Sequence, residues 1–300
     1  MALSLTISDI VFGLTPSSRD ESIVEGAVFT GAGLSSINFR NILNHLEYLS
    51  SLNRYTGYLG CEEASKYIFN YFSKTLGLKT WVEEYELPIP FDHGSSITIY
   101  FDGETKTIEA YALLPNNVQT SYGNYTGYLV YCGFGTINDL NNVNGEINGS
   151  IALMEFNSGY NWLNVMRVGA KAVVFIAPND TMRSESDRKN LDIPLKFPRV
   201  YVSRDDGAYL RNLAVSGKSV TATVRVGMKW IHAKAKNIIA VLNGTDPREV
   251  ENTIALMAYY DSASIVPALS PGAEEAVGIA SLLELARLLK ENPPRRPVWF

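Results

Sequence analysis

The chain has 300 residues, of which 46% are hydrophobic, so it is long and apolar enough to bury the cores of two compact domains. Its net charge of −5 and the lack of any long basic run argue against nucleic acid as a partner. No apolar run approaches the ~20 residues that cross a bilayer, which excludes a transmembrane segment within this sequence. The first residues lack the basic region of a secretory signal peptide and carry Asp9 instead.

Charged residues make up only 19% of the chain, while Asn and Tyr are abundant, a composition that fits an extracytoplasmic protein. The cysteines are Cys61 and Cys132, and their spacing is neither that of a zinc knuckle nor that of a redox motif. They allow at most one disulfide, and two buried thiols are the simpler interpretation. A glycoprotein is possible through four Asn-x-Ser/Thr sites, a number close to chance for this composition: Asn124, Asn148, Asn179 and Asn243.

Residues 1–35 mix a strand-like stretch with a polar, glycine-rich one, and we place no element there. A helix follows, capped by Ser35 or Ser36, because apolar residues then recur at helical spacing. A second helix is predicted to start near Glu62 and to end at Gly77. The inward residues are predicted to be Phe39, Ile42, Leu43, Leu46 and Leu49 in the first helix, and Ala64, Tyr67, Ile68, Tyr71 and Phe72 in the second.

The segment 78–87 alternates like a strand, and Pro88 and Pro90 are predicted to end it. Residues 95–112 predict two strands around the turn sequence FDGET. From about residue 115 to 225 the pattern becomes one of short apolar strands with few helices. We therefore predict a separate, mainly β domain in the middle of the chain. Short helices are expected within it at 161–169 and 205–217.

The pattern changes again at Asn237, after which two strands precede a long helix. The strands are predicted at 237–244 and 252–260, and we expect residues 237–240 to pair with residues 254–258 in one sheet.

The helix is predicted at 274–292, with acids at its N-terminus and a lysine near its C-terminus, as the helix dipole prefers. Another strand begins at Pro297. Strand, crossover helix and strand in this order start an α/β sheet. Because so short a segment cannot close a core alone, we expect the natural chain to continue beyond Phe300.

Four motifs follow one another at regular spacing over residues 237–300. They read NIIAVLNGTDP from Asn237, AYYDS from Ala258, PGAEEAVGIASLLELARLL from Pro271 and RRPVWF from Arg295. In order and spacing they resemble the start of the catalytic domain of the di-zinc aminopeptidase family, whose relatives include glutamate carboxypeptidase, the transferrin receptor ectodomain and nicastrin. The resemblance implies an α/β fold, the start of an aminopeptidase-type mixed sheet with helices.

The resemblance extends toward the N-terminus. Residues 46–78 resemble that family's leading segment, and the middle of the chain resembles the protease-associated domain inserted in many relatives. The mainly β domain thus interrupts the peptidase-like one. The implied organisation is an unplaced segment at 1–37, the first helices and strands of the peptidase-like domain at 38–113, the protease-associated domain at 114–230 and the first part of the peptidase-like α/β domain at 237–300.

The resemblance also assigns candidate site residues. The family takes its first zinc-binding histidine from an H-Y-D motif, and Tyr259 stands at that position. A phenol with a pKa of ~10 is a poor zinc ligand at neutral pH. Asp261 stands where the family keeps the aspartate that orients this histidine. The metal-bridging aspartate of the family falls on Glu274, which is one methylene longer, and Glu275 replaces the asparagine beside it.

Each of these residues also has a plainer interpretation. Asp261 can be a loop-start residue that bonds its own backbone. Glu274 and Glu275 can be first-turn acids favoured by the helix dipole. Tyr260 is best explained as an aromatic strand residue. The histidines lie outside the motif region and are best explained as surface or satisfied core residues: His45, His93 and His232.

Three functions are open. A degenerate metal site, with Tyr259 for His, Glu274 for Asp and a vestigial Asp261, favours a non-catalytic recognition or scaffold protein without a cofactor. An active zinc aminopeptidase is the alternative if residues beyond 300 complete the site. The third is a binding module that acts through the protease-associated domain. The expected partner is a peptide or protein, in a larger assembly, and the expected location is extracytoplasmic or membrane-associated.

Overall fold

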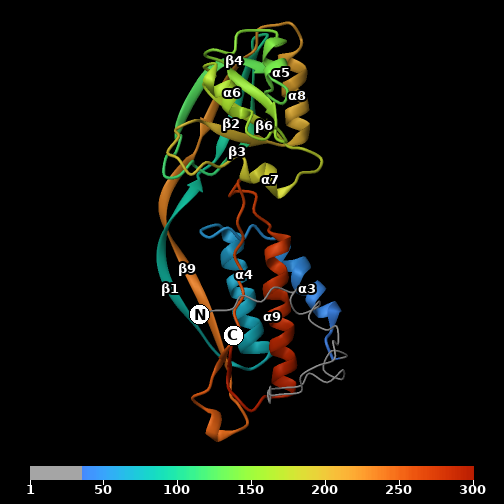
Figure 1. Cartoon of the computed structure of the whole chain (residues 1–300), viewed down its shortest axis with the longest axis vertical. Coiled ribbons are helices and arrows are strands. Elements are labelled where there is room, and N and C mark those ends of the chain that lie inside the picture. The colour runs from blue at the N-terminus through green and yellow to red at the C-terminus, as the bar shows by residue number, and fades with distance from the viewer. Residues whose placement is uncertain (1–35) are drawn as a thin grey trace, which may run out of the picture. The chain divides into compact units, whose positions relative to one another are not determined.

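The computed structural model describes residues 36–300 (Figure 1), so the stretch 1–35, which includes Ser35, lies outside the described residues. The chain forms two compact units. The first unit takes the chain up to Tyr85, Ala235–Ser262 and Pro271–Phe300, and the second takes Glu86–Lys234 and Ala263–Ser270. The second unit is wider than the domain expected at 114–230, because the strands of the 95–112 hairpin are part of its β-barrel.

The helices of the first unit contribute to its core together with strand residues, and they lie beside one another in Figure 1. They are α3 (Phe39–Ser50), α4 (Leu59–Asn70), which continues as the π-helix η1 (Tyr71–Thr75), and α9 (Ala273–Glu291), besides the 3-10 turn η2 (Pro247–Glu249). All three predicted helices of this unit are therefore confirmed.

The cap of α3 differs from the prediction. The Asn38 side chain accepts hydrogen bonds from the backbone N–H groups of Arg40 (3.0 Å) and Asn41 (3.4 Å), so the predicted cap at Ser36 is wrong. A side-chain oxygen at this position satisfies N–H groups that have no partner within the first turn.

The inward face of α3 is also rotated from the predicted one. Leu49 is buried as expected, but Phe39 is 69% exposed and Leu43 is exposed. Glu284 of α9 explains the rotation, because its buried carboxylate accepts hydrogen bonds from Asn41 Nδ2 (3.0 Å) and from the backbone N–H of Asn38 (2.8 Å). Pairing this buried carboxylate outweighs burying the two apolar residues, since an unpaired buried charge is costly.

Helix α4 begins at Leu59, earlier than the predicted start near Glu62, and ends at Asn70, so the predicted end at Gly77 is reached only through the π-helix that follows. The π-helix η1 carries the chain on to Leu76, and Gly77 then takes a φ of +62°, the left-handed conformation typical of a helix end. Ala64, Ile68 and Phe72 are buried in the core, as predicted.

The first unit contains a mixed sheet with the strand order β1-β9-β11-β10. Strand β10 pairs with β11 in parallel, and β11 pairs with β9 antiparallel. The residues 237–240 and 254–258 lie in one sheet as predicted, but their predicted pairing is wrong, because β11 lies between β9 and β10. The strands are β1 (Lys79–Asp92), β9 (Met228–Leu242), β10 (Ile254–Ala255) and β11 (Val298–Trp299).

Strand β1 continues through Pro88 and Pro90 as far as Asp92, so the predicted end at the prolines is wrong. Proline lacks a backbone N–H and is tolerated in strands at a sheet edge. Strand β1 is the first strand in the order β1-β9-β11-β10, which gives it such an edge.

The second unit is built on a closed barrel with the strand order β2-β3-β7-β6-β5-β4-β8. This confirms a mainly β region in the middle of the chain. The run β4-β5-β6-β7 is parallel, and the remaining pairs are antiparallel. The strands are β2 (Ser95–Phe101), β3 (Glu104–Ala112), β4 (Gly123–Tyr131), β5 (Ile151–Glu155), β6 (Ala172–Ile176), β7 (Arg199–Val202) and β8 (Thr221–Val226).

Local sequence explains much of this unit. The predicted hairpin at 95–112 is confirmed, and its turn places Asp102 (φ 50°) and Gly103 (φ 80°) in the left-handed region, as two-residue hairpin turns require. The helices of this unit are α5 (Ile137–Asn141), α6 (Trp162–Arg167), α7 (Arg183–Asp187) and α8 (Arg204–Ala214). Two of them, α6 and α8, are the helices predicted at 161–169 and 205–217.

Both cysteines are buried free thiols, Cys61 in the first unit and Cys132 in the second. This confirms the simpler interpretation of the two residues. None of the helices within residues 36–300 is long and apolar enough to cross a membrane.

Candidate functional site

The candidate site residues lie in the first unit, in the segment that follows β10 and in the first turn of α9. Tyr259 and Tyr260 point to opposite sides of the extended segment that follows β10. Tyr259 is 83% exposed, whereas Tyr260 packs against the core and its hydroxyl donates to the Lys236 carbonyl (2.9 Å). Asp261 is half-buried, and Glu274 lies exposed in the first turn of α9. An exposed phenol thus occupies the position at which the family resemblance expects a histidine.

Asp261 has partners within the first unit. Its Oδ2 atom accepts a hydrogen bond from Thr56 Oγ1 (3.3 Å). Burial, with a smaller contribution from the charge of Asp261, raises the pKa of Tyr55 to about 12 and the pKa of Cys61 to about 11. Cys61 is therefore a protonated thiol at neutral pH, and such a thiol is neither a good nucleophile nor a good metal ligand.

Arg54, on the segment between α3 and α4, organises the backbone around Asp261. Its side chain is fully buried. The guanidinium donates hydrogen bonds to the backbone carbonyls of Leu49, Tyr260 (2.8 Å), Pro271 (2.5 Å) and Gly272 (2.7 Å). Its own carbonyl accepts a hydrogen bond from the Ser262 N–H (3.1 Å). One side chain thus fixes both ends of the loop that begins with Asp261.

The charge of Arg54 is balanced by nearby carboxylates. Desolvation lowers the pKa of Arg54, and the negative charges of Glu275 and Asp261 act in the opposite direction. The sequence prediction included Arg54 only as part of a family-like segment and missed its role. The signal available was a single charged residue in the otherwise uncharged stretch NRYTGYLG. Its acceptors at 260, 271 and 272 are too distant in sequence to be read from that stretch.

Gly272 ends the loop and precedes α9, and its position requires a glycine. Its φ is +53°, in the left-handed region. A Cβ atom there would lie 2.4 Å from Ser262 Cβ and 2.8 Å from Glu275 Oε2. The close approach brings the Glu275 carboxylate toward the same backbone that Arg54 binds.

These residues do not fit the zinc centre of the family. Such a centre needs imidazole and carboxylate ligands gathered around two ions. From Ser36 to Phe300, no group of three or more His, Cys, Asp or Glu side chains is arranged to hold a metal ion. His45 is buried, and its Nδ1 atom lies 2.6 Å from the Tyr67 hydroxyl. We therefore assign no catalytic step through zinc to the described residues.

Comparison with known proteins places this geometry in context. Residues 237–300 match the family model of Peptidase family M28. No curated protein matches the chain. A solved zinc aminopeptidase from Bacillus subtilis is 21% identical with a TM-score of 0.55, over 86% of this chain and 60% of that one. A peptidase M28 precursor from Shewanella amazonensis is 16% identical with a TM-score of 0.53, over 89% of this chain and 64% of that one.

The chain therefore spans less than two thirds of the length of these solved structures. The TM-scores show that the chain shares its fold with these structures. Because the identity is low, the chemistry of this chain has to be argued from its own residues. The segment 237–300 thus carries the sequence pattern of peptidase family M28, on a chain that shares its fold with zinc aminopeptidases.

Proposed function

We propose that this chain is an aminopeptidase-fold protein that recognises a peptide or protein partner without cleaving it. The observation that carries the proposal is Tyr259, a phenol that is 83% exposed at the position of the family's first histidine ligand. A phenol is protonated at neutral pH and a poor zinc ligand. Two further features support the proposal. Glu274 replaces the bridging aspartate, and the Asp261 carboxylate already accepts a hydrogen bond from Thr56.

The second candidate is an active zinc aminopeptidase whose metal site is completed by residues outside positions 1–300. Two observations favour it. Residues 237–300 match Peptidase family M28, and the chain covers only 60% of the Bacillus subtilis zinc aminopeptidase. Under this candidate Asp261 keeps its role of orienting a metal ligand, and that ligand comes from another part of the protein.

Metal analysis of the purified protein, followed by an aminopeptidase assay with added Zn²⁺ or Co²⁺, separates the two candidates. We expect no stoichiometric metal and no cleavage of an aminoacyl substrate. Tyr259→His is expected to stay inactive, with Tyr259→Phe as the matched control, because Glu274 is unchanged. Stoichiometric zinc together with cleavage that stops on chelation and on the Asp261→Asn substitution would establish the second candidate instead.

We also propose an extracytoplasmic or membrane-associated location. The supporting observation is a charged-residue content of only 19%. Fractionation of the native source, with glycosidase treatment of the protein, tests the proposal. A protein found only in the cytosolic fraction and unaffected by glycosidase would contradict it.

A further inference from the structure

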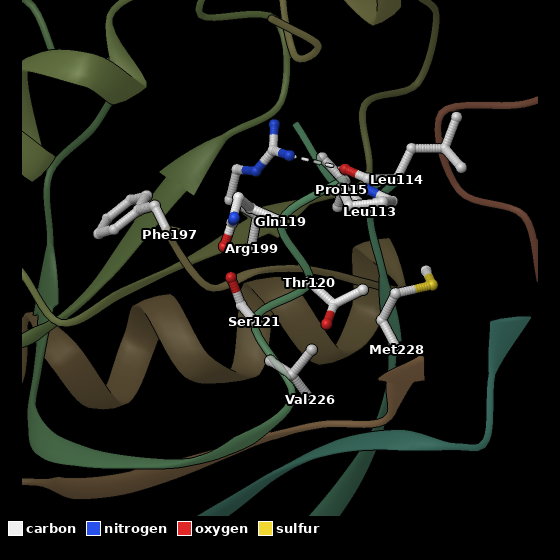
Figure 2. Close-up of a pocket in the computed structure, with 10 residues that line it drawn as sticks. All are labelled: Leu113, Leu114, Pro115, Gln119, Thr120, Ser121, Phe197, Arg199, Val226 and Met228. Carbon is white, nitrogen blue, oxygen red and sulfur yellow. Dashed lines mark hydrogen bonds between the residues drawn. The ribbon is translucent and has the colours of Figure 1, made fainter. Parts of the chain in front are cut away.

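The second unit contains a cavity at one end of its barrel (Figure 2). Arg199 in its wall is only 4% exposed, and its Nη2 atom donates a hydrogen bond to the Leu114 carbonyl (2.7 Å), the bond drawn in Figure 2. The cavity has room for about one water molecule, which excludes a ligand of ordinary size. A ligand of this unit therefore has to bind on the outer surface of the barrel.

The outer surface carries rows of hydroxyl groups on four adjacent strands, in the order β3, β2, β8 and β4. Successive side chains of a strand point to opposite faces of the sheet. Inward side chains such as Ile97, Ile99 and Val224 are buried, so the side chains between them face outward. In register across the four strands, one outward row is Thr105, Tyr100, Thr221 and Tyr128, and the next is Thr107, Thr98, Thr223 and Thr126.

Every position in these two rows bears a hydroxyl group, and none bears a charge. Thr98 Oγ1 lies 3.1 Å from Thr107 Oγ1, and Thr126 Oγ1 lies 2.8 Å from Thr223 Oγ1. A hydroxyl group has one donor and two acceptor positions, so each pair keeps hydrogen-bonding capacity toward solvent. Threonine is common in strands, but protein surfaces usually intersperse charges. The two rows therefore favour a neutral ligand that is itself rich in hydroxyl groups.

Two exposed tyrosines distinguish this face from an ordinary polar strand surface. Tyr100 is 45% exposed and Tyr128 is 62% exposed, although both lie within strands. Both are register partners of Thr221, so only β8 separates them. Two strand spacings place their backbones ~10 Å apart. The face of an aromatic ring is negatively polarised, and it attracts the positively polarised C–H groups on the flat side of a sugar ring.

We propose that this outer face binds a linear, uncharged polysaccharide whose sugar rings are joined by β-linkages. Tyr100 and Tyr128 stack against two rings of the same chain, and the threonine rows exchange hydrogen bonds with its hydroxyl groups. A β-linked chain is extended and crosses neighbouring strands to reach both tyrosines, whereas an α-linked chain curls away from the row. The inference goes beyond the proposed function, and it does not depend on the metal site.

NMR titration of the ¹⁵N-labelled full chain, produced in bacteria without glycans, tests the proposal. The probes are β-1,4-linked tetrasaccharides of glucose and of N-acetylglucosamine, the α-1,4-linked tetrasaccharide of glucose, and a branched mannose glycan. We expect at least one β-linked probe to shift amide signals of β2, β8 and β4, and to bind at least about tenfold more tightly than the α-linked probe. No shift with either β-linked probe, shifts confined to other elements, equal binding of the α-linked probe, or tighter binding of the branched glycan would each overturn the proposal.

Substitutions separate ring stacking from hydroxyl contacts. Tyr100→Ala and Tyr128→Ala are each expected to weaken binding at least about fivefold, whereas Tyr128→Phe keeps the ring and most of the binding. Thr223→Val replaces a hydroxyl by a methyl group of similar size and is expected to weaken binding about two- to tenfold, so it serves if the alanine variants do not fold. Tyr160→Ala is the matched control, because Tyr160 is 52% exposed but lies after β5, outside the rows.

Three further results would overturn the proposal. Equal losses in Tyr160→Ala and Tyr128→Ala would show non-specific contact with any exposed ring. A change in the sedimentation of the sugar-free protein on Tyr128→Ala would make the face an interface between copies of the chain. Asn124 precedes Thr126 on the same outward side of β4 and belongs to an Asn-x-Thr site, so a glycan found on Asn124 of the native protein would cover the rows.

Discussion

Among the described residues, each of the two units buries one arginine, and the two residues differ in how their hydrogen bonds are satisfied. Arg54 in the first unit donates to four backbone carbonyls and lies near the charges of Glu275 and Asp261. Arg199 in the second unit donates to two carbonyls, has an unused Nε–H and takes part in no ion pair of the described chain. The paired arginine holds backbone segments in place, whereas the partly paired one keeps a buried N–H group without a partner, which lowers stability.

The largest effect is expected for Arg54→Met. The substitution removes four hydrogen bonds to backbone carbonyls and the positive charge near Glu275 and Asp261. The carbonyls of Leu49 and Gly272 keep a backbone N–H donor, whereas those of Tyr260 and Pro271 lose their donor. Each carbonyl left without a donor costs about 1–3 kcal/mol and each of the other two lost hydrogen bonds about 0.5–1.5 kcal/mol, so we expect a loss of about 4–6 kcal/mol in the free energy of unfolding. Urea denaturation measures it. Arg54→Lys should lose less, because an ammonium still reaches some of the carbonyls. A loss below about 1 kcal/mol for Arg54→Met would show that the loop does not depend on this residue.

Arg199→Met is expected to cost less, about 2–4 kcal/mol, because it removes two hydrogen bonds to carbonyls and not four, and it also removes an uncompensated buried charge. The comparison of the two methionine variants under the same conditions is the sharpest test of the difference between the arginines. Equal losses would mean that Arg199 is as fully paired in solution as Arg54, with ordered water at its Nε atom.

Gly272→Ala tests the close approach of the loop and α9. The φ of +53° and the 2.4 Å separation from Ser262 Cβ predict a loss of about 1–3 kcal/mol through strain and local displacement. Gly217→Ala is a matched control, because Gly217 also has a positive φ but its Cβ would meet no atom within 4 Å. If both variants lose the same stability, the backbone conformation alone accounts for the effect and crowding at Gly272 contributes nothing.

The smallest effect is a pH dependence confined to the first unit. Burial lowers the pKa of His45 below 6.5, and the charge of Glu284 opposes this less strongly. The neutral ring contacts the Tyr67 hydroxyl and lies against Tyr71. Because the unfolded chain binds the proton more readily, stability is full above pH 6.5 and falls as the pH drops below it.

The slope below pH 6.5 is expected to be at most about 1.4 kcal/mol per pH unit. Denaturation at a series of pH values measures it. The variant His45→Gln should flatten the curve between neutral pH and the range in which carboxylates begin to protonate. His232→Gln is the control, because His232 is exposed in the second unit. An unchanged slope in His45→Gln would assign the dependence to other groups.

Local patterns were sufficient for the elements whose partners are near in sequence. The hairpin at 95–112 and helix α9 are confirmed because turn residues, alternation and helical spacing are properties of a few consecutive residues. The motif order over 237–300 was likewise sufficient for the resemblance to the aminopeptidase family, and the match to Peptidase family M28 agrees with it.

The candidate site shows where local patterns stop. Tyr259, Asp261 and Glu274 were found from the motifs, yet the sequence gives neither the exposure of Tyr259 nor the contact of Asp261 with Thr56. Arg199 was missed altogether. Its signal was a single charged residue in the apolar stretch FPRVYV, which marks a buried charge but not the cavity beside it.

The sequence by itself determined the types of element, the change of pattern between the peptidase-like and β regions, and the replacement of a histidine by Tyr259. Only the tertiary structure decided that Asn41 turns inward toward Glu284, that β11 lies between β9 and β10, and that Arg54 binds both ends of one loop. The physical reason is that a buried polar group selects its partners by position in space, and these partners lie more than 200 residues away along the chain.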